Sequence, residues 1–110
     1  MRRFRVELRS PGGVRIIDCG KNEFIWDAAA RCGLKLPAIC HQGRCLTCAA
    51  RLIKGYVDQS AAASYFQADS DAGFVLLCAA RPRSDLVCET HQEWIMRDHR
   101  KALGLPAPYS

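Results

Sequence analysis

The sequence predicts a single α+β domain, and three features of the chain support this fold class. Its 110 residues, of which 49% are hydrophobic, suffice for one compact core and are too few for two. Residues 4–9 alternate apolar and polar side chains, which is the period of a half-buried strand, whereas residues 22–33 repeat apolar side chains at helical spacing. Strands and helices along one short chain indicate a sheet with packed helices.

The first elements form a hairpin. The strand over residues 4–9 is followed by a Pro-Gly-Gly turn at residues 11–13, and a second short strand covers residues 14–18. The apolar side chains of this second strand are Val14 and Ile16, together with Ile17.

One helix of about three turns follows the hairpin. Asn22 is placed to cap its N-terminus, because an asparagine side chain accepts backbone N–H bonds, and Gly33 is placed to end it. Residues 36–48 then show no clear period and contain three cysteines. This stretch predicts a loop wrapped around a bound group.

The remaining core elements are short. Residues 49–54 and 86–88 predict strands, the apolar run 74–77 predicts a buried segment, and residues 81–85 predict a turn that contains proline. The polar, alanine-rich residues 58–64 predict a turn and a short helix.

A second helix is expected near the C-terminus. Thr90 and Glu93 have the spacing of a capping box, and Gly104 ends the helix. One face of this helix is expected to consist of Ile95, His99, Ala102 and Leu103. In one interpretation Ile95 forms a partner surface with Trp94 and Met96, and in the other the face that carries Ile95 and His99 packs on the sheet.

The seven cysteines carry the strongest functional signal. Cys40, Cys45, Cys48 and Cys78 have the spacing C-x4-C-x2-C, with the fourth cysteine after 29 further residues, which is the plant-type pattern of 2Fe-2S ligands. Iron in such a cluster takes thiolate ligands, and three of them on one loop allow the loop to close over both metal atoms. We therefore predict one 2Fe-2S cluster at these four residues.

Other interpretations of the cysteines remain open. A four-cysteine zinc site uses the same ligands, although zinc modules normally pair two C-x2-C knuckles and this chain has one. A disulfide framework requires an oxidising compartment, and no activated thiolate nucleophile is indicated. Outside the pattern, we expect Cys32 and Cys88 to be buried and Cys19 to be more exposed. His91 and His99 have no partner at ligand spacing and are interpreted as structural.

Four segments resemble the plant-type and cyanobacterial 2Fe-2S ferredoxins. They are residues 40–49 (CHQGRCLTCA), 55–60 (GYVDQS), 73–78 (GFVLLC) and 84–91 (SDLVCETH). The resemblance implies a β-grasp fold, in which a helix packs across a mixed sheet, and a one-electron carrier near about −400 mV rather than an enzyme. On this basis residues 1–93 form a ferredoxin-type domain, and residues 94–110 form a C-terminal helical extension packed on or tethered to it.

The chain departs from the usual acidic members of this family. It carries 16 Lys and Arg against 11 Asp and Glu, a formal charge of +5. Where the family has an aromatic residue followed by carboxylates, this sequence has the uncharged residues Ser64, Tyr65, Phe66 and Gln67. Ile39 and Arg44 replace smaller or polar residues beside the ligands. Arg44 and His41 either favour the reduced cluster through positive charge or point into water.

These features lead to a functional hypothesis. We expect a soluble carrier that passes electrons from a reductase or photosystem-type donor to redox enzymes, with partners that differ from those of acidic ferredoxins. The alternative is a cluster-dependent regulatory or interaction protein. Because the basic residues form no stripe with interleaved aromatics, nucleic acid is not expected as a partner. No apolar run reaches the roughly 18 residues of a membrane span, and no signal peptide is recognised. We therefore expect a monomer in the cytoplasm, or in the plastid stroma after removal of a transit peptide.

Overall fold

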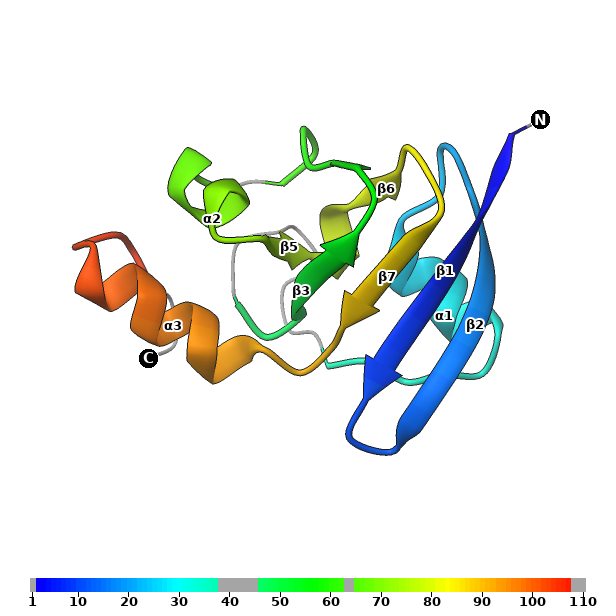
Figure 1. Ribbon diagram of the computed structural model, residues 1–110, viewed down its shortest axis with the longest axis horizontal. Coiled ribbons are helices and arrows are strands. Elements are labelled where there is room, and N and C mark those ends of the chain that lie inside the picture. Colours follow the sequence, from blue (N-terminus) through cyan, green and yellow to red (C-terminus); the bar gives the residue numbers. More distant parts are fainter. Residues whose placement is uncertain (1, 38–45, 63–64, 108–110) are drawn as a thin grey trace.

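The computed structural model describes residues 2–37, 46–62 and 65–107 of the chain (Figure 1). Within these ranges the main sheet has five strands in the order β2-β1-β7-β3-β5, and a second sheet pairs β4 with β6. The strands are β1 (Arg3–Ser10), β2 (Gly13–Gly20), β3 (Ala49–Lys54), β4 (Val57–Asp58), β5 (Phe74–Leu76), β6 (Arg81–Pro82) and β7 (Leu86–Glu89). The helices are α1 (Ile25–Arg31), α2 (Gln67–Asp71) and α3 (Glu93–Ala102), with a 3-10 turn at Leu77–Ala79.

The main sheet is mixed. β1 runs parallel to β7 and antiparallel to β2, and β3 is antiparallel to both β7 and β5. Helix α1 packs Ile25 and Ala28 into the same buried cluster as Val6, Leu8 and Ile17 of the hairpin. The predicted α+β class, with a helix across a mixed sheet, is therefore confirmed. No helix in the described ranges is long and apolar enough to cross a membrane.

The predicted hairpin is confirmed, and Ile17 is the apolar residue of its second strand that faces the core. Val14 and Ile16 are both at least half exposed, whereas Ile17 is buried. The turn between Ser10 and Gly13 sets a register in which Ile17 lies opposite the inward-facing Val6. Successive side chains of a strand point to opposite faces, so this register places Ile16 opposite Glu7 on the outer surface.

Helix α1 begins later than predicted, and the capping role given to Asn22 is wrong. The residue before the helix is Phe24, and no side chain caps it. A turn precedes the helix instead, because the Glu23 N–H donates to the Gly20 carbonyl and the Glu23 carboxylate accepts the Gly20 N–H. The predicted end is confirmed, since Gly33 follows the helix with a φ of 81°.

The short helix predicted within residues 58–64 is also wrong, because the described part of that segment contains no helix. The helical turn comes later, at α2. Its position follows from Asp69, whose buried carboxylate accepts the Phe66 N–H at 3.0 Å and so satisfies a free donor at the start of the helix.

Helix α3 lies at the end of the molecule away from the β1–β2 hairpin (Figure 1). The predicted capping box is wrong, since Gln92 precedes the helix and the Thr90 hydroxyl instead interacts with His91 Nδ1 at 2.7 Å. The structure contradicts one residue of each interpretation of this helix, because Ile95 is not buried against the sheet and Met96 is not exposed to a partner. Ile95 is 52% exposed, and the fully or almost fully buried side chains of the helix are Met96, Arg97 and Arg100.

Of the glycines in the described ranges, Gly55 is the one whose replacement the fold resists most. Its φ is 101°, and a Cβ atom there would lie 2.4 Å from the Asp85 carbonyl oxygen and 2.6 Å from Leu86 Cδ2. We therefore expect Gly55→Ala to lower the free energy of unfolding by about 2–4 kcal/mol, from backbone strain and the clash together. Gly33→Ala is the matched control, because its φ is 81° but its Cβ would meet nothing within 4 Å. Urea unfolding should show a loss of about 1 kcal/mol for the control, and equal losses for both variants would contradict the clash.

Candidate metal centre

Two of the four predicted ligands lie in the described ranges, and the sheet brings them together. Cys48 directly precedes β3, and Cys78 lies in the 3-10 turn that follows β5. The two strands pair antiparallel with Ala49 opposite Leu76, and the Leu77 N–H donates to the Cys48 carbonyl at 3.3 Å. This pairing places Cys48 Sγ 3.1 Å from Cys78 Sγ.

The chemistry of this pair fits a metal site. The two side chains do not form a disulfide with each other, because their separation of 3.1 Å exceeds the roughly 2.05 Å of a disulfide bond. Cys48 is 2% and Cys78 4% exposed, so the two soft donors converge in a water-poor environment. Cys40 and Cys45, with Ile39, His41 and Arg44, lie outside the described residues. The four-cysteine site as a whole therefore stays a prediction.

An apolar cluster surrounds the two thiols. Its other buried members are Leu46, Ala49, Phe74, Leu76, Ala79 and Met96. They come from the segment that runs from Leu46 into β3, from the segment β5 to the 3-10 turn and from α3, so three separate parts of the chain build this environment. An apolar surrounding of this kind controls solvent access and local dielectric at a metal site.

Gln59 supports the site and was missed by the sequence analysis. Strand β5 is the edge of the main sheet, and the Gln59 side chain pairs with it by accepting the Leu76 N–H at 2.7 Å and donating to the Leu76 carbonyl at 3.3 Å. The amide therefore replaces a neighbouring strand two residues before Cys78. A lone glutamine in a turn carries no sequence signal for such a role.

The cysteines outside the ligand pattern are poor redox candidates. Cys19 is fully buried, so the prediction that it is more exposed is wrong, and its Sγ lies 3.4 Å from the Glu23 carbonyl oxygen. Burial, with a further contribution from the charge of Glu23, raises the pKa of Cys19 to about 12. Burial alone raises the pKa of Cys88 to about 12. Cys88 is buried as predicted, whereas Cys32 is half-buried.

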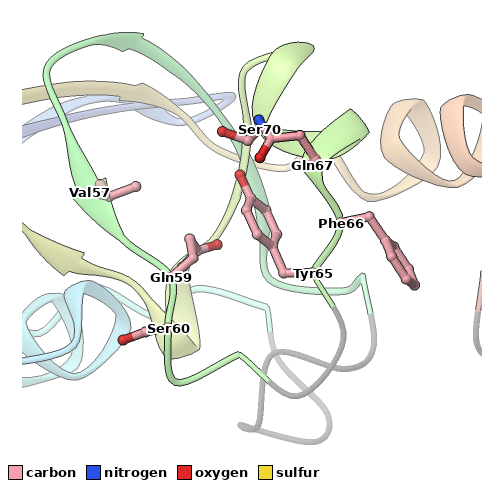
Figure 2. A pocket seen from close by; sticks show the side chains of 7 residues that line it. All are labelled: Val57, Gln59, Ser60, Tyr65, Phe66, Gln67 and Ser70. Atoms are coloured by element: carbon pink, nitrogen blue, oxygen red, sulfur yellow. The ribbon is translucent and has the colours of Figure 1, made fainter.

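A surface depression lies beside β4 and α2. Figure 2 shows its lining, which contains no charged side chain: Val57, Gln59, Ser60, Tyr65, Phe66, Gln67 and Ser70. The Tyr65 hydroxyl donates to the Phe74 carbonyl, and burial raises the pKa of Tyr65. The Phe66 ring points away from that of Tyr65 and lies under the Arg100 guanidinium, 4.9 Å from ring centre to Cζ. Ser64 lies outside the described residues.

The two histidines of the C-terminal region occupy different settings. His91 is exposed and adopts a φ of 61°. The His99 ring packs against Phe74 with 5.3 Å between ring centres, and its Nε2 lies 3.8 Å from Asp69 Oδ1. Within the described ranges, neither belongs to a group of three or more His, Cys, Asp or Glu side chains that could hold a metal ion.

Comparison with known proteins gives a consistent picture. Residues 11–83 match the family described as 2Fe-2S iron-sulfur cluster binding domain. Ferredoxin-2 of Synechococcus is 40% identical over 93 residues, which cover 84% of this chain and 89% of the relative. The chloroplastic ferredoxin-6 of Zea mays is 34% identical over 90 residues, 81% of this chain and 58% of the relative.

Two solved structures are similar to the described fold. Pectocin M2 superposes with a TM-score of 0.75 at 29% identity, over 84% of this chain and 34% of that one. The cytochrome P450 reductase of Amycolatopsis gives a TM-score of 0.71 at 30% identity, over 80% of this chain and 26% of that one. This chain therefore spans about a third or less of either of these proteins.

The raised pKa values predict slow alkylation of Cys19 and Cys88 in the folded protein. Only the thiolate reacts, and a shift from the usual 9.0 to about 12 lowers the thiolate fraction at pH 8 about a thousandfold. Iodoacetamide labelling followed by mass spectrometry should show this difference between folded and urea-unfolded chains, with folded-state rates rising about tenfold per pH unit.

The same shift fixes the sign of the pH effect on stability. Because the folded pKa lies above the unfolded one, these thiols stabilise the fold below about pH 9, and this contribution is lost as the pH rises towards 12. For the labelling experiment, equal rates for Cys19 in the folded and unfolded chains would contradict the raised pKa of its thiol.

Proposed function

Since the chain belongs to the family of 2Fe-2S iron-sulfur cluster binding domains and is an electron carrier with one 2Fe-2S cluster, we propose that Cys40, Cys45, Cys48 and Cys78 are the ligands of that cluster. The approach of Cys48 Sγ to Cys78 Sγ at 3.1 Å is the observation that carries the proposal. The C-x4-C-x2-C spacing supports the two ligands that precede Cys48.

The protein's own contribution is to bind, bury and orient the cluster. When bound, the cluster accepts and releases one electron, and no catalytic acid or base is needed for that step. The pairing of β3 with β5 holds two thiolate donors in place, and Gln59 fixes the edge strand beside them. The apolar side chains around the thiols exclude water, which disfavours the more negative reduced state and supports a low potential.

Replacing a proposed ligand should abolish the cluster. We expect Cys48→Ser and Cys78→Ser to lose the visible absorption of the oxidised protein and the electron paramagnetic resonance signal of the reduced one, because serine is a harder donor than thiolate. Cys32→Ser is the matched control, since it makes the same change at a cysteine that lies outside the ligand pattern. A Cys48→Ser protein with full iron content and unchanged spectra would refute the assignment.

We propose that the surface around the depression of Figure 2 is the docking face for redox partners, and that it selects them without using carboxylates. The depression of Figure 2 includes Tyr65, Phe66 and Gln67, at positions where acidic ferredoxins carry an aromatic residue and then carboxylates. An uncharged lining on a chain of formal charge +5 is a poor match for a basic partner surface. The similarity to a cytochrome P450 reductase supports a reductase as donor and an oxygenase of the cytochrome P450 class as acceptor.

Introducing carboxylates at this face should recruit a basic partner. We expect the unmodified chain to bind a basic ferredoxin reductase weakly at all ionic strengths. The double variant Ser60→Glu with Gln67→Glu should bind it about threefold to tenfold more tightly at low salt, because each exposed charge pair contributes a fraction of a kcal/mol to about 1 kcal/mol. This gain should disappear as salt screens the charges.

Titration calorimetry at low and high salt measures the effect. The control is Asn22→Glu, which adds a carboxylate in the exposed turn before α1, outside the lining of the depression. A tight, salt-sensitive complex of the unmodified chain with the basic reductase would refute the proposal.

A further inference from the structure

We propose that α3 forms one wall of the metal centre, with Met96 as the positioning residue that keeps water from the cluster and with the buried Asp69–Arg100 ion pair holding the helix in place. This inference rests on the proposed ligation by Cys48 and Cys78. It concerns the residues that surround the ligands and set the properties of the site.

The start of α3 is tied to the segment that carries Cys48. The Gln92 N–H, immediately before the helix, donates to the Ala49 carbonyl at 3.1 Å. Ala49 is the residue that follows Cys48 and the first residue of β3. The residue before α3 is therefore hydrogen-bonded to the residue that follows the proposed ligand Cys48.

Met96 lies one turn further along the helix. Its side chain is fully buried and belongs to the same apolar cluster as Cys48, Cys78 and Phe74. Ala107, beyond the helix, packs against this cluster as well. The C-terminal segment thus contributes one fully buried side chain and one partly buried residue to the surroundings of the two thiols.

The Asp69–Arg100 pair fixes the far end of the helix. Arg100 Nη2 lies 2.7 Å from Asp69 Oδ2 and Arg100 Nε lies 3.3 Å from Asp69 Oδ1, and both side chains are 0% exposed. Arg100 Nη1 also donates to the Pro106 carbonyl at 3.1 Å. A buried ion pair tolerates little misalignment, because each charge is desolvated and needs its partner. One guanidinium therefore joins α2, α3 and the C-terminal tail in a single arrangement.

The opposite face of α3 provides an internal comparison. Ile95 and Trp94 are 52% and 67% exposed, although they adjoin Met96 in the sequence. Arg97 pairs with Glu93 of the same helix at 2.8 Å and so does not connect the helix to another element through that bond. Met96, through the apolar cluster, and Arg100, through Asp69 and Pro106, each connect α3 to other parts of the chain.

The consequence for the cluster follows from its charge. A cluster with four thiolate ligands is more negative in the reduced state, and water stabilises that state better than an apolar wall does. A variant that admits water beside the thiols should therefore raise the reduction potential. It should also give a chelator easier access to the iron.

The test compares three variants of the holoprotein. Met96→Gln keeps nearly the same volume but places a polar amide in the wall, whereas Met96→Leu keeps the wall apolar. Ile95→Gln introduces the same polar amide at the exposed residue next to Met96 and serves as the control. We expect Met96→Gln to have a more positive potential in an anaerobic redox titration and to lose iron to a chelator about tenfold faster. Met96→Leu and Ile95→Gln should match the unmodified protein in both measurements.

A second pair of variants releases the helix without altering Met96. Asp69→Asn with Arg100→Gln removes both buried charges together, so neither is left unpaired. We expect this double variant to lose iron faster, and we expect Met96→Gln to add little when combined with it, because the wall is already open. Full additivity of the two effects would contradict a shared role in holding α3 against the site.

The outcomes separate this inference from the proposed function. If Met96→Gln and Ile95→Gln have the same potential and the same rate of iron loss as a cluster-containing unmodified protein, the inference is wrong and the ligand assignment stands. If Cys48→Ser retains the cluster, the ligand assignment fails, and this inference fails with it. Circular dichroism of each variant confirms that the fold is retained before the potentials and the rates of iron loss are compared.

Discussion

The antiparallel pairing of β3 with β5 is the constraint on which the centre depends. It converts a separation of 30 residues between Cys48 and Cys78 into 3.1 Å between their sulfur atoms. Strand β5 has only three residues and lies at the edge of the sheet, where unpaired backbone groups weaken a strand. Gln59 bonds both backbone groups of Leu76, and the Tyr65 hydroxyl bonds the Phe74 carbonyl. Two side chains thus hydrogen-bond three backbone groups of the edge strand and help to hold the ligand segment in register.

Local patterns in the sequence predict much of this architecture but not its faces. The strands around Val6 and Leu86 and the ligand spacing can be predicted from the sequence, because period and spacing are properties of residues near one another in the chain. The inward face of β2 is not visible, because Val14 and Ile16 satisfy the strand period equally well on either side. The choice is made by the two-residue turn and by pairing with β1, which places Ile17 opposite Val6. Part of the ligand loop lies outside the described residues, so the site itself rests on spacing and on two of its four cysteines.

Helix α3 shows a second limit of sequence patterns. Hydrophobicity places Ile95 inside and Arg100 outside, and the structure has the reverse. An arginine becomes a core residue when a carboxylate meets it there, and Asp69 is 31 residues away in the sequence. No pattern within the helix carries that information, because the partner belongs to α2. The same ion pair also explains why α2 occurs where it does, since Asp69 both accepts the Phe66 N–H and holds Arg100.

These pairings change what the net charge of +5 means for the metal centre. Arg97 and Arg100 are the buried cations of the helix that adjoins the site, and each faces a carboxylate, Glu93 or Asp69, at 2.7–2.8 Å. A matched pair produces a field that falls off much faster than that of a free charge. The two buried arginines therefore add little net field at the site, whereas charges at the exposed surface remain unpaired more often and are screened by salt. Among the described residues, the surroundings of Cys48 and Cys78 are apolar, so this part of the structure acts on the site through solvent access rather than through unpaired charge.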